Sequence, residues 1–159
     1  ARFLAGARGP DFAMVGFRMA HTLSEHGAVS RGVTSAAADG RLHAIVETHG
    51  IAAAEIGPGQ KYSGQEYVSM NCWGFTPALF AGLDGQFREF LAARRGEPKA
   101  EFYLPVVVSE MIARGEAAAR VLPTESAWFG ITYREDKARV QAAIAALVRA
   151  GRYPARLWD

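Results

Sequence analysis

The stretch EYVSMNCWGFTPALF, residues 66–80, is apolar and rich in strand-forming residues. One amide, Asn71, interrupts it, and Thr76-Pro77 ends its strand-like part. The pattern predicts a buried strand of about ten residues. A helix should follow, with Thr76 as N-cap and Pro77 at its first position. Because a buried amide needs a hydrogen-bond partner, Asn71 requires one, and backbone in a neighbouring loop could supply it.

Strand and helix patterns alternate along the rest of the chain. Short apolar or alternating runs predict strands, and apolar residues spaced by three and four predict helices. The predicted strands cover 11–19, 28–35, 41–48, 118–124 and 126–133. The predicted helices fall within 78–95, 100–115 and 135–151. The last of these has the clearest apolar face.

Turn and breaker residues refine these elements. Asp39-Gly40 predicts a hairpin, and in the strand after it alternation places Leu42, Ala44 and Val46 on one buried face. Two internal glycines leave open whether 78–95 forms one helix or two short ones. The helix within 100–115 contains a proline, which implies either a late start or a kink.

Strands mixed with helices, and one βαβ crossover, predict an α/β fold. We expect a single domain over 1–159, with a mixed, mostly parallel sheet flanked by helices. The length of 159 residues, half of them apolar, suits one domain with a sizeable core.

Composition narrows the class of protein. The net charge of +2, from 18 basic and 16 acidic residues, is too balanced to favour binding to nucleic acid or to a membrane. No run approaches the roughly 20 apolar residues of a membrane span. The single cysteine, Cys72, cannot form an intrachain disulfide, which fits a reducing cytoplasm, and we expect it to be a small buried hydrophobe.

Few chemical motifs stand out from the residues alone. The chain has no GxGxxG, P-loop or CxxC motif, and no nucleophile elbow. Four carboxylates lie at the ends of predicted elements, where ligands collect in open α/β sheets: Glu25, Glu47, Glu101 and Asp136. For Glu101 and Asp136 the alternative is a first-turn charge that stabilises a helix.

Five motifs, taken in order, resemble the C-terminal half of the sugar-phosphate nucleotidyltransferase family. They are SEHGAVSRGV (24–33), VETHG (46–50), SMNCWGFTPALF (69–80), EFYLPVVVSEMIARG (101–115) and SAWFGITYRED (126–136). They are most similar to a bacterial branch called simply nucleotidyltransferase. The resemblance implies a nucleotide-diphospho-sugar transferase-like fold that is incomplete at its N-terminal side.

The resemblance also implies a set of site residues. The substrate-binding residues would be Gly27, Glu47, Asn71, Glu25, Trp73 and Glu101. The metal ligand would be Asp136, for a Mg²⁺ whose site lies mostly in the missing half. The family's Lys-Pro pair after the sugar-binding Glu is replaced here by Thr48 and His49, so the usual phosphate-binding lysine is not carried over.

The implied reaction transfers a nucleotidyl group from an NTP to a sugar phosphate and releases pyrophosphate. This chain would be the acceptor-binding part, and it is expected to be inactive alone because the glycine-rich NTP loop is absent. The expected partners are a sugar phosphate and an NTP, not nucleic acid or membrane. The alternative is a non-catalytic α/β binding or oligomerisation module that self-associates through an exposed sheet edge.

Overall fold

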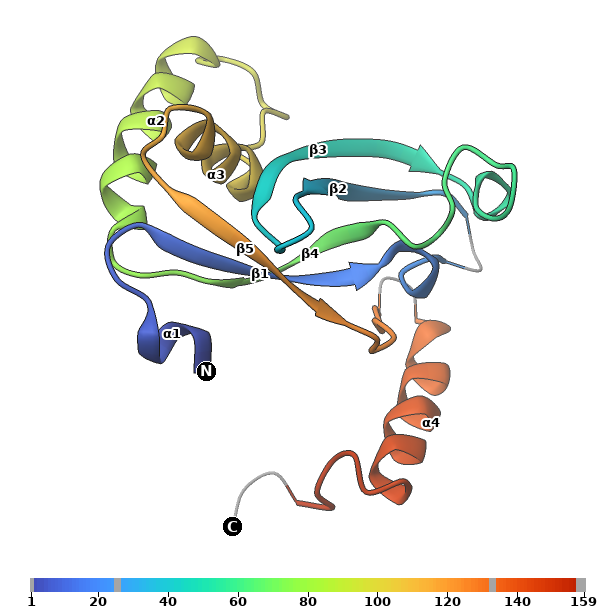
Figure 1. Ribbon diagram of the computed structural model, residues 1–159. Helices are drawn as coiled ribbons and strands as arrows, with labels where there is room; N and C mark the ends of the chain where they lie inside the picture. Colours follow the sequence, from blue (N-terminus) through green and yellow to red (C-terminus); the bar gives the residue numbers. More distant parts are fainter. Residues whose placement is uncertain (1, 25–26, 132–133, 157–159) are drawn as a thin grey trace. The chain divides into compact units, whose positions relative to one another are not determined.

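The computed structural model describes residues 2–24, 27–131 and 134–156 (Figure 1). The chain divides into two compact units, Ala1–Ser126 and Ala127–Asp159. The first contains a five-stranded sheet, three α-helices and two short 3-10 helices. Its α-helices are α1 (Arg2–Gly6), α2 (Leu79–Ala93) and α3 (Leu104–Ala113). Its strands are β1 (Asp11–Arg18), β2 (Val29–Ala36), β3 (Leu42–Ile51), β4 (Tyr67–Gly74) and β5 (Ala118–Thr124).

The sheet is mixed, with strand order β3-β2-β4-β1-β5. Only β1 and β5 pair in parallel; the β1–β4, β2–β4 and β2–β3 pairs are antiparallel. The expected α/β class and mixed sheet are therefore confirmed, but the expectation of a mostly parallel sheet is wrong. The α2–α3 connection also forms no βαβ unit, because β5 runs opposite to β4 and is separated from it by β1.

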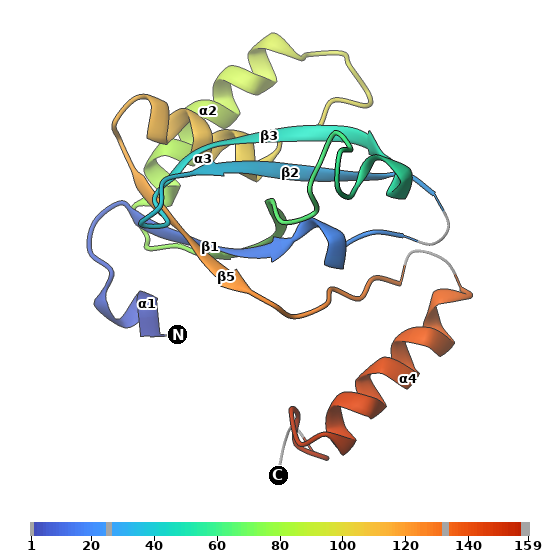
Figure 2. The same cartoon turned by 45° about the vertical axis from the view of Figure 1, so that its right-hand side comes forward.

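The sheet curls so strongly that its two edge strands meet at one end. Arg41 and Arg120 form an antiparallel bridge, and the Val121 N–H donates to the Gly40 carbonyl at 2.8 Å. Figure 2 shows β2 and β3 arching away from β1 and β5. The curl defines a concave face, on which α3 packs.

The main core fills this concave face. Helix α3 lies across β3 and also contacts β4 and β5, and α2 packs beside it (Figure 2). The buried residues of this core are Phe12, Met14, Leu42, Ile45, Leu79, Val107, Val108, Met111, Ala119 and Val121. β3 is an edge strand, so its outward backbone groups have no strand partner among the described residues. One of them, the Ile45 N–H, donates to the Ser109 hydroxyl of α3 at 3.1 Å.

A smaller core lies on the opposite, convex face. Its buried residues are Met19, Ile51 and Val68. The 3-10 helix Met19–His21 and the segment between β3 and β4, which includes the 3-10 helix Ala53–Glu55, cover this face. Both faces of the sheet are thus packed.

A bulge changes which side chains of β3 are buried. Ser35 pairs with Ala44 but Ala36 pairs with Leu42, so β3 carries one extra residue. Leu42 and Ile45 therefore share the concave core, and Val46 is 63% exposed. The predicted buried face of Leu42, Ala44 and Val46 is wrong, because simple alternation does not survive a bulge.

A second bulge lies at the centre of β4. Met14 pairs with Trp73 and Gly16 pairs with Ser69, so three residues of β4 face one residue of β1. Asn71 lies in this bulge with φ 55°. Asn71 and Cys72 are both exposed. The expectations of a buried amide and a buried cysteine are wrong, because the bulge turns this part of the strand outward.

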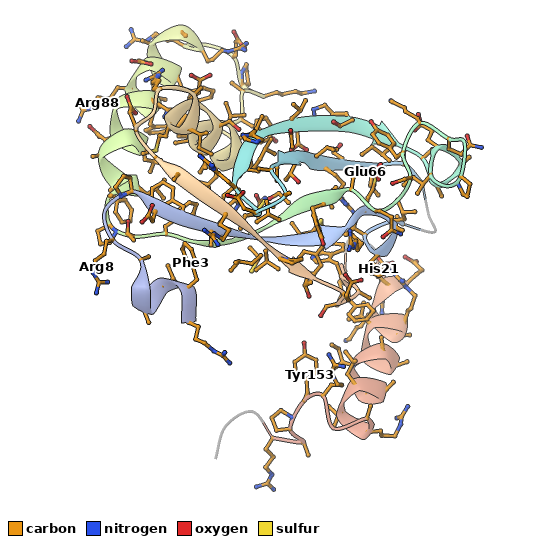
Figure 3. All side chains as sticks on the ribbon, in the orientation of Figure 1. Phe3, Arg8, His21, Glu66, Arg88 and Tyr153 are labelled. Carbon is orange, nitrogen blue, oxygen red and sulfur yellow. The ribbon has the colours of Figure 1, made fainter. Side chains whose placement is uncertain are left out.

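Helix α2 is continuous through both of its glycines, and its outer face carries Arg88 (Figure 3). It begins at Leu79, with Ala78 rather than Thr76 at the N-cap position. The Thr76 hydroxyl instead donates to the Gly9 carbonyl, so the predicted cap is wrong. Helix α3 shows the predicted late start, with Pro105 in its first turn.

The second unit contains α4 (Asp136–Arg149), as the periodicity predicts. Gly151, with φ 70°, ends it: its N–H donates to the Val148 carbonyl and that of Arg152 to the Leu147 carbonyl, a Schellman motif. Of the strand predicted at 126–133, the described residues 126–131 form no strand, and 132–133 lie outside the described part.

Candidate functional site

A row of polar and small residues crosses the concave face of the sheet. Glu47 of β3 pairs with Gly32 of β2, and Gly32 pairs with Ser69 of β4. A Cβ placed on Gly32 would lie 2.9 Å from Ile45 Cγ2, 3.3 Å from Ser69 Cβ and 3.6 Å from Glu47 Oε2. Glu47 and Ser69 therefore project on the same side as Ile45, which belongs to the core under α3. The row is a shallow floor with a carboxylate at one end and a hydroxyl near the other.

The start of α3 adds Tyr103 and Glu101 to this end of the face. Tyr103 is the N-cap residue of α3 and is 39% exposed. A hydrogen bond with the Glu101 carboxylate raises the pKa of the Tyr103 phenol, and the charge of Glu47 raises it further. Glu47 and Glu101 thus both raise the pKa of the same phenol, although 54 residues separate them in the sequence.

Arg31 lies next to this row on β2 and anchors the preceding loop. Its guanidinium donates to the Thr22 hydroxyl at 3.1 Å and to the Thr22 carbonyl. Thr22 is fully buried. Burial lowers the pKa of Arg31, and the charge of Glu47 opposes that shift. The loop that carries Gly27 is therefore tied to the strand beside Glu47.

His49 and Ser30 form a second polar pair at the same end of the sheet. His49 Nδ1 lies 2.9 Å from Ser30 Oγ, and both side chains are exposed. The β2–β3 register shifts between Val29 and Arg31, so this pair lies at a bulge and not in the regular alternation of the Glu47 row. Hydroxyl and imidazole groups are suitable partners for the hydroxyls of a ligand.

The other expected substrate-binding residues lie in different environments. Gly27, with φ 147°, forms a bridge with Ser24 at the entrance to β2, and a Cβ there would meet no atom within 4 Å. Asn71 lies near Ser69, since its N–H donates to the Ser69 hydroxyl at 3.2 Å. Glu25 lies outside the described residues.

Trp73 lies in the main core instead of on open surface. Its ring stacks on Phe75, with centroids 5.4 Å apart, and it packs against the buried residues under the helices. Its Nε1 is buried and has no hydrogen-bond partner among the residues that the structure describes. The geometry favours a packing role for Trp73.

A groove of about 1080 Å³ runs beside Tyr103 between the C-terminal half of α2 and the outer face of α3. Glu101, Phe102 and Tyr103 line it together with residues of the α2–α3 connection. Phe102 packs this connection against α2, because its ring centroid lies 5.2 Å from those of both Phe87 and Phe90. Tyr103 and Glu101 therefore line this groove, and Glu47 is not among its lining residues.

The described residues do not form a magnesium centre. No group of three or more His, Cys, Asp or Glu side chains among them is placed to hold a metal ion. Asp136, the expected metal ligand, begins α4, and its carboxylate lies 3.8 Å from the Arg139 guanidinium. That partner is a cation, which does not favour a metal ion beside it.

Sequence reasoning missed Tyr103, Ser69 and Arg31. Ser69 stands two residues before Asn71, so a pattern with a period of two already contained the signal. Tyr103 directly precedes the Leu-Pro start of α3, where an N-cap residue is exposed. No feature of the sequence indicates the link between Arg31 and Thr22, because it depends on the fold of the loop.

No family model matches the chain, and no curated protein matches it significantly. None of the described helices has the length and apolar character that a membrane crossing requires.

Proposed function

We propose that this chain binds a sugar phosphate as the acceptor-binding part of a nucleotidyltransferase. The observation that supports this proposal most directly is the position of Glu47. Its carboxylate projects from the concave face beside glycine and serine, in electrostatic range of Tyr103 at the start of α3. The ordered resemblance of the five motifs supports the same proposal.

The chemistry of this end of the sheet suits a polyol. A carboxylate accepts hydrogen bonds from neighbouring hydroxyls, and hydroxyl side chains both donate and accept. Gly32 and Ser69 are buried beside Ile45, so a sugar would approach this row at the half-buried Glu47 carboxylate.

In the complete reaction an oxygen of the sugar phosphate attacks the α-phosphorus of an NTP, and pyrophosphate leaves. The developing charge requires cations or preorganised donors. The residues described here would hold the sugar through its hydroxyls. The Mg²⁺ that the resemblance implies would take its ligands from outside this set.

The oligomerisation alternative is less favoured by the sheet edges. The Ser109 hydroxyl occupies the edge of β3 at Ile45, and β3 and β5 meet at Arg41 and Arg120. A sheet edge that is covered or paired recruits a second chain less readily than a free one.

The test is calorimetric titration of the chain with glucose 1-phosphate. We expect saturable binding, and we expect Glu47→Gln to weaken it at least about tenfold, since a charge-assisted hydrogen bond contributes about 1.5–3 kcal/mol. Glu116→Gln, at an exposed glutamate in the turn before β5, is the matched control and should bind normally. Absence of binding by the wild type, or equal binding by Glu47→Gln, would refute the proposal.

A further inference from the structure

Helix α2 carries a row of exposed side chains along its outer face. Its members are four residues at heptad spacing, here called the α2 stripe: Phe80, Asp84, Phe87 and Leu91. Phe80 is 67% exposed, Leu91 52% and Phe87 42%. Single exposed apolar side chains are ordinary, but three in line on one helix face are typical of an interaction surface.

The α2 stripe is already ordered in the single chain. The Phe87 ring packs on the rings of Phe90 and Phe102, with centroids 6.3 and 5.2 Å away. The Asp84 carboxylate accepts from the Arg88 guanidinium at 2.8 and 3.2 Å, and Arg88 lies on the outer side of α2 (Figure 3). A surface that is ordered before binding loses less conformational entropy when a partner docks on it.

The charges of this face decide how a second copy of the helix would pack on it. A parallel pair would place Asp84 against Asp84, and the like charges would repel each other. In an antiparallel pair, Phe80 faces Leu91 of the second copy at both ends, and Asp84 faces Phe87 in the middle. Each Arg88 then lies beside Asp84 of the other copy, so the two signs alternate across the contact, and the two helix dipoles oppose each other.

We propose that two copies of this chain associate through antiparallel contact of their α2 stripes. The occupant is a second copy because the acid and the base of this face are placed to neutralise each other across a two-fold axis. The contact uses a helix face and leaves the sheet edges as they are. This inference goes beyond the proposed function and does not depend on it, since Glu47 lies on β3.

The length of α2 limits the strength of this contact. Its 15 residues span about 22 Å. A helix pair of this length buries less area than a standard interface of about 1,600 Å². We therefore expect a weak dimer in exchange with monomer, whose fraction rises with protein concentration.

The first test is sedimentation velocity of the full chain from low micromolar to near-millimolar concentration. We expect a monomer–dimer equilibrium, and we expect Phe80→Ser to weaken it at least about tenfold, because each dimer loses two apolar contacts. Val46→Ser, at a valine of β3 that is 63% exposed, is the matched control and should associate as wild type. Urea unfolding at low concentration should be unchanged in Phe80→Ser, because Phe80 is exposed in the single chain.

Charge reversal tests the antiparallel direction. Asp84→Arg leaves two bases on the α2 face and Arg88→Asp leaves two acids, so each variant alone should associate more weakly than wild type. Mixed in equal amounts, the two variants should form a heterodimer that is tighter than either homodimer. A wild type that stays monomeric at every concentration would overturn the inference, and so would a dimer that Phe80→Ser and both charge reversals leave unchanged. Neither result would affect the proposed sugar-phosphate binding, which is measured separately by titration.

Discussion

Asn71 adopts a left-handed backbone conformation in the middle of a strand, at φ 55°. L-residues avoid this region at a cost of about 1–2 kcal/mol, but asparagine enters it more readily than most and glycine enters it freely. The residue therefore fits the β4 bulge through its backbone conformation, whether or not its amide also contacts a ligand.

Two substitutions separate these roles of Asn71. Asn71→Gly keeps the left-handed conformation and removes the amide, so its stability should stay within about 0.5 kcal/mol of wild type. Asn71→Ala should destabilise the chain by about 1 kcal/mol, because alanine is strained at this φ. Urea unfolding measures both. Equal destabilisation by the two variants would contradict the conformational role, and weaker glucose 1-phosphate binding by the folded Gly variant would assign the amide to the ligand.

Glu66 closes the turn that leads into β4, at the end of the sheet where Figure 3 labels it. Its carboxylate accepts from the Ser63 N–H at 2.8 Å, the Ser63 hydroxyl at 2.9 Å and the Gly64 N–H at 2.8 Å. Partial burial raises the pKa of Glu66, but these hydrogen bonds outweigh it and hold the pKa below its ordinary 4.5.

A lowered folded-state pKa gives Glu66 a defined effect on stability. The contribution is present above the unfolded pKa and is lost as the pH falls through the folded pKa. We expect Glu66→Gln to cost about 1 kcal/mol at neutral pH, because a neutral amide accepts these bonds less well, and the deficit should shrink toward pH 3. Urea unfolding at several pH values measures it. A deficit that does not depend on pH would contradict this reasoning.

At the scale of elements, the α2–α3 contact depends on Gly82. A Cβ there would lie 2.7 Å from Met111 Sδ and 2.8 Å from Met111 Cε. Gly85, one turn further along α2, faces open space. The two glycines of one helix thus have opposite requirements.

Alanine should be tolerated less well at Gly82 than at Gly85. Gly85→Ala should stabilise the chain by up to about 1 kcal/mol through helix propensity. Gly82→Ala gains the same propensity but overpacks Met111, at about 1–3 kcal/mol, so it should be less stable than Gly85→Ala by at least 1 kcal/mol. Chemical unfolding of the two variants measures this difference. Equal stabilities would show that Gly82 of α2 does not lie against Met111 of α3.

Local patterns predict single elements better than they predict pairings. The periodicity of 135–151 predicts α4, and Asp39-Gly40 predicts the β2–β3 hairpin; the structure confirms both. Strand directions and bulges depend on contacts far apart in the sequence, so the mixed sheet is confirmed, but its mostly parallel pairing and the buried face containing Val46 are wrong. Glu47 and Glu101 could be nominated from element ends, but their joint action on Tyr103 depends on how α3 sits on β3.

At the scale of the whole molecule, both hydrophobic cores belong to the first unit. Their buried residues all lie between Phe12 and Val121, within Ala1–Ser126. A chain that ends at Ser126 should therefore keep a cooperative unfolding transition, whereas an isolated α4 peptide of this length should be only marginally helical in water. Near-ultraviolet circular dichroism with urea unfolding tests this. Loss of the cooperative transition would show that the first unit needs residues from the second.

The most direct measurement of the proposed acceptor binding is an amide NMR titration of the full chain with glucose 1-phosphate. We predict saturable shifts at Glu47, Ser69 and Tyr103, while the convex-face segment around Ala53–Glu55 stays unchanged. Shifts confined to that convex segment, or no saturable shifts at millimolar ligand, would contradict a sugar-phosphate site on the concave face.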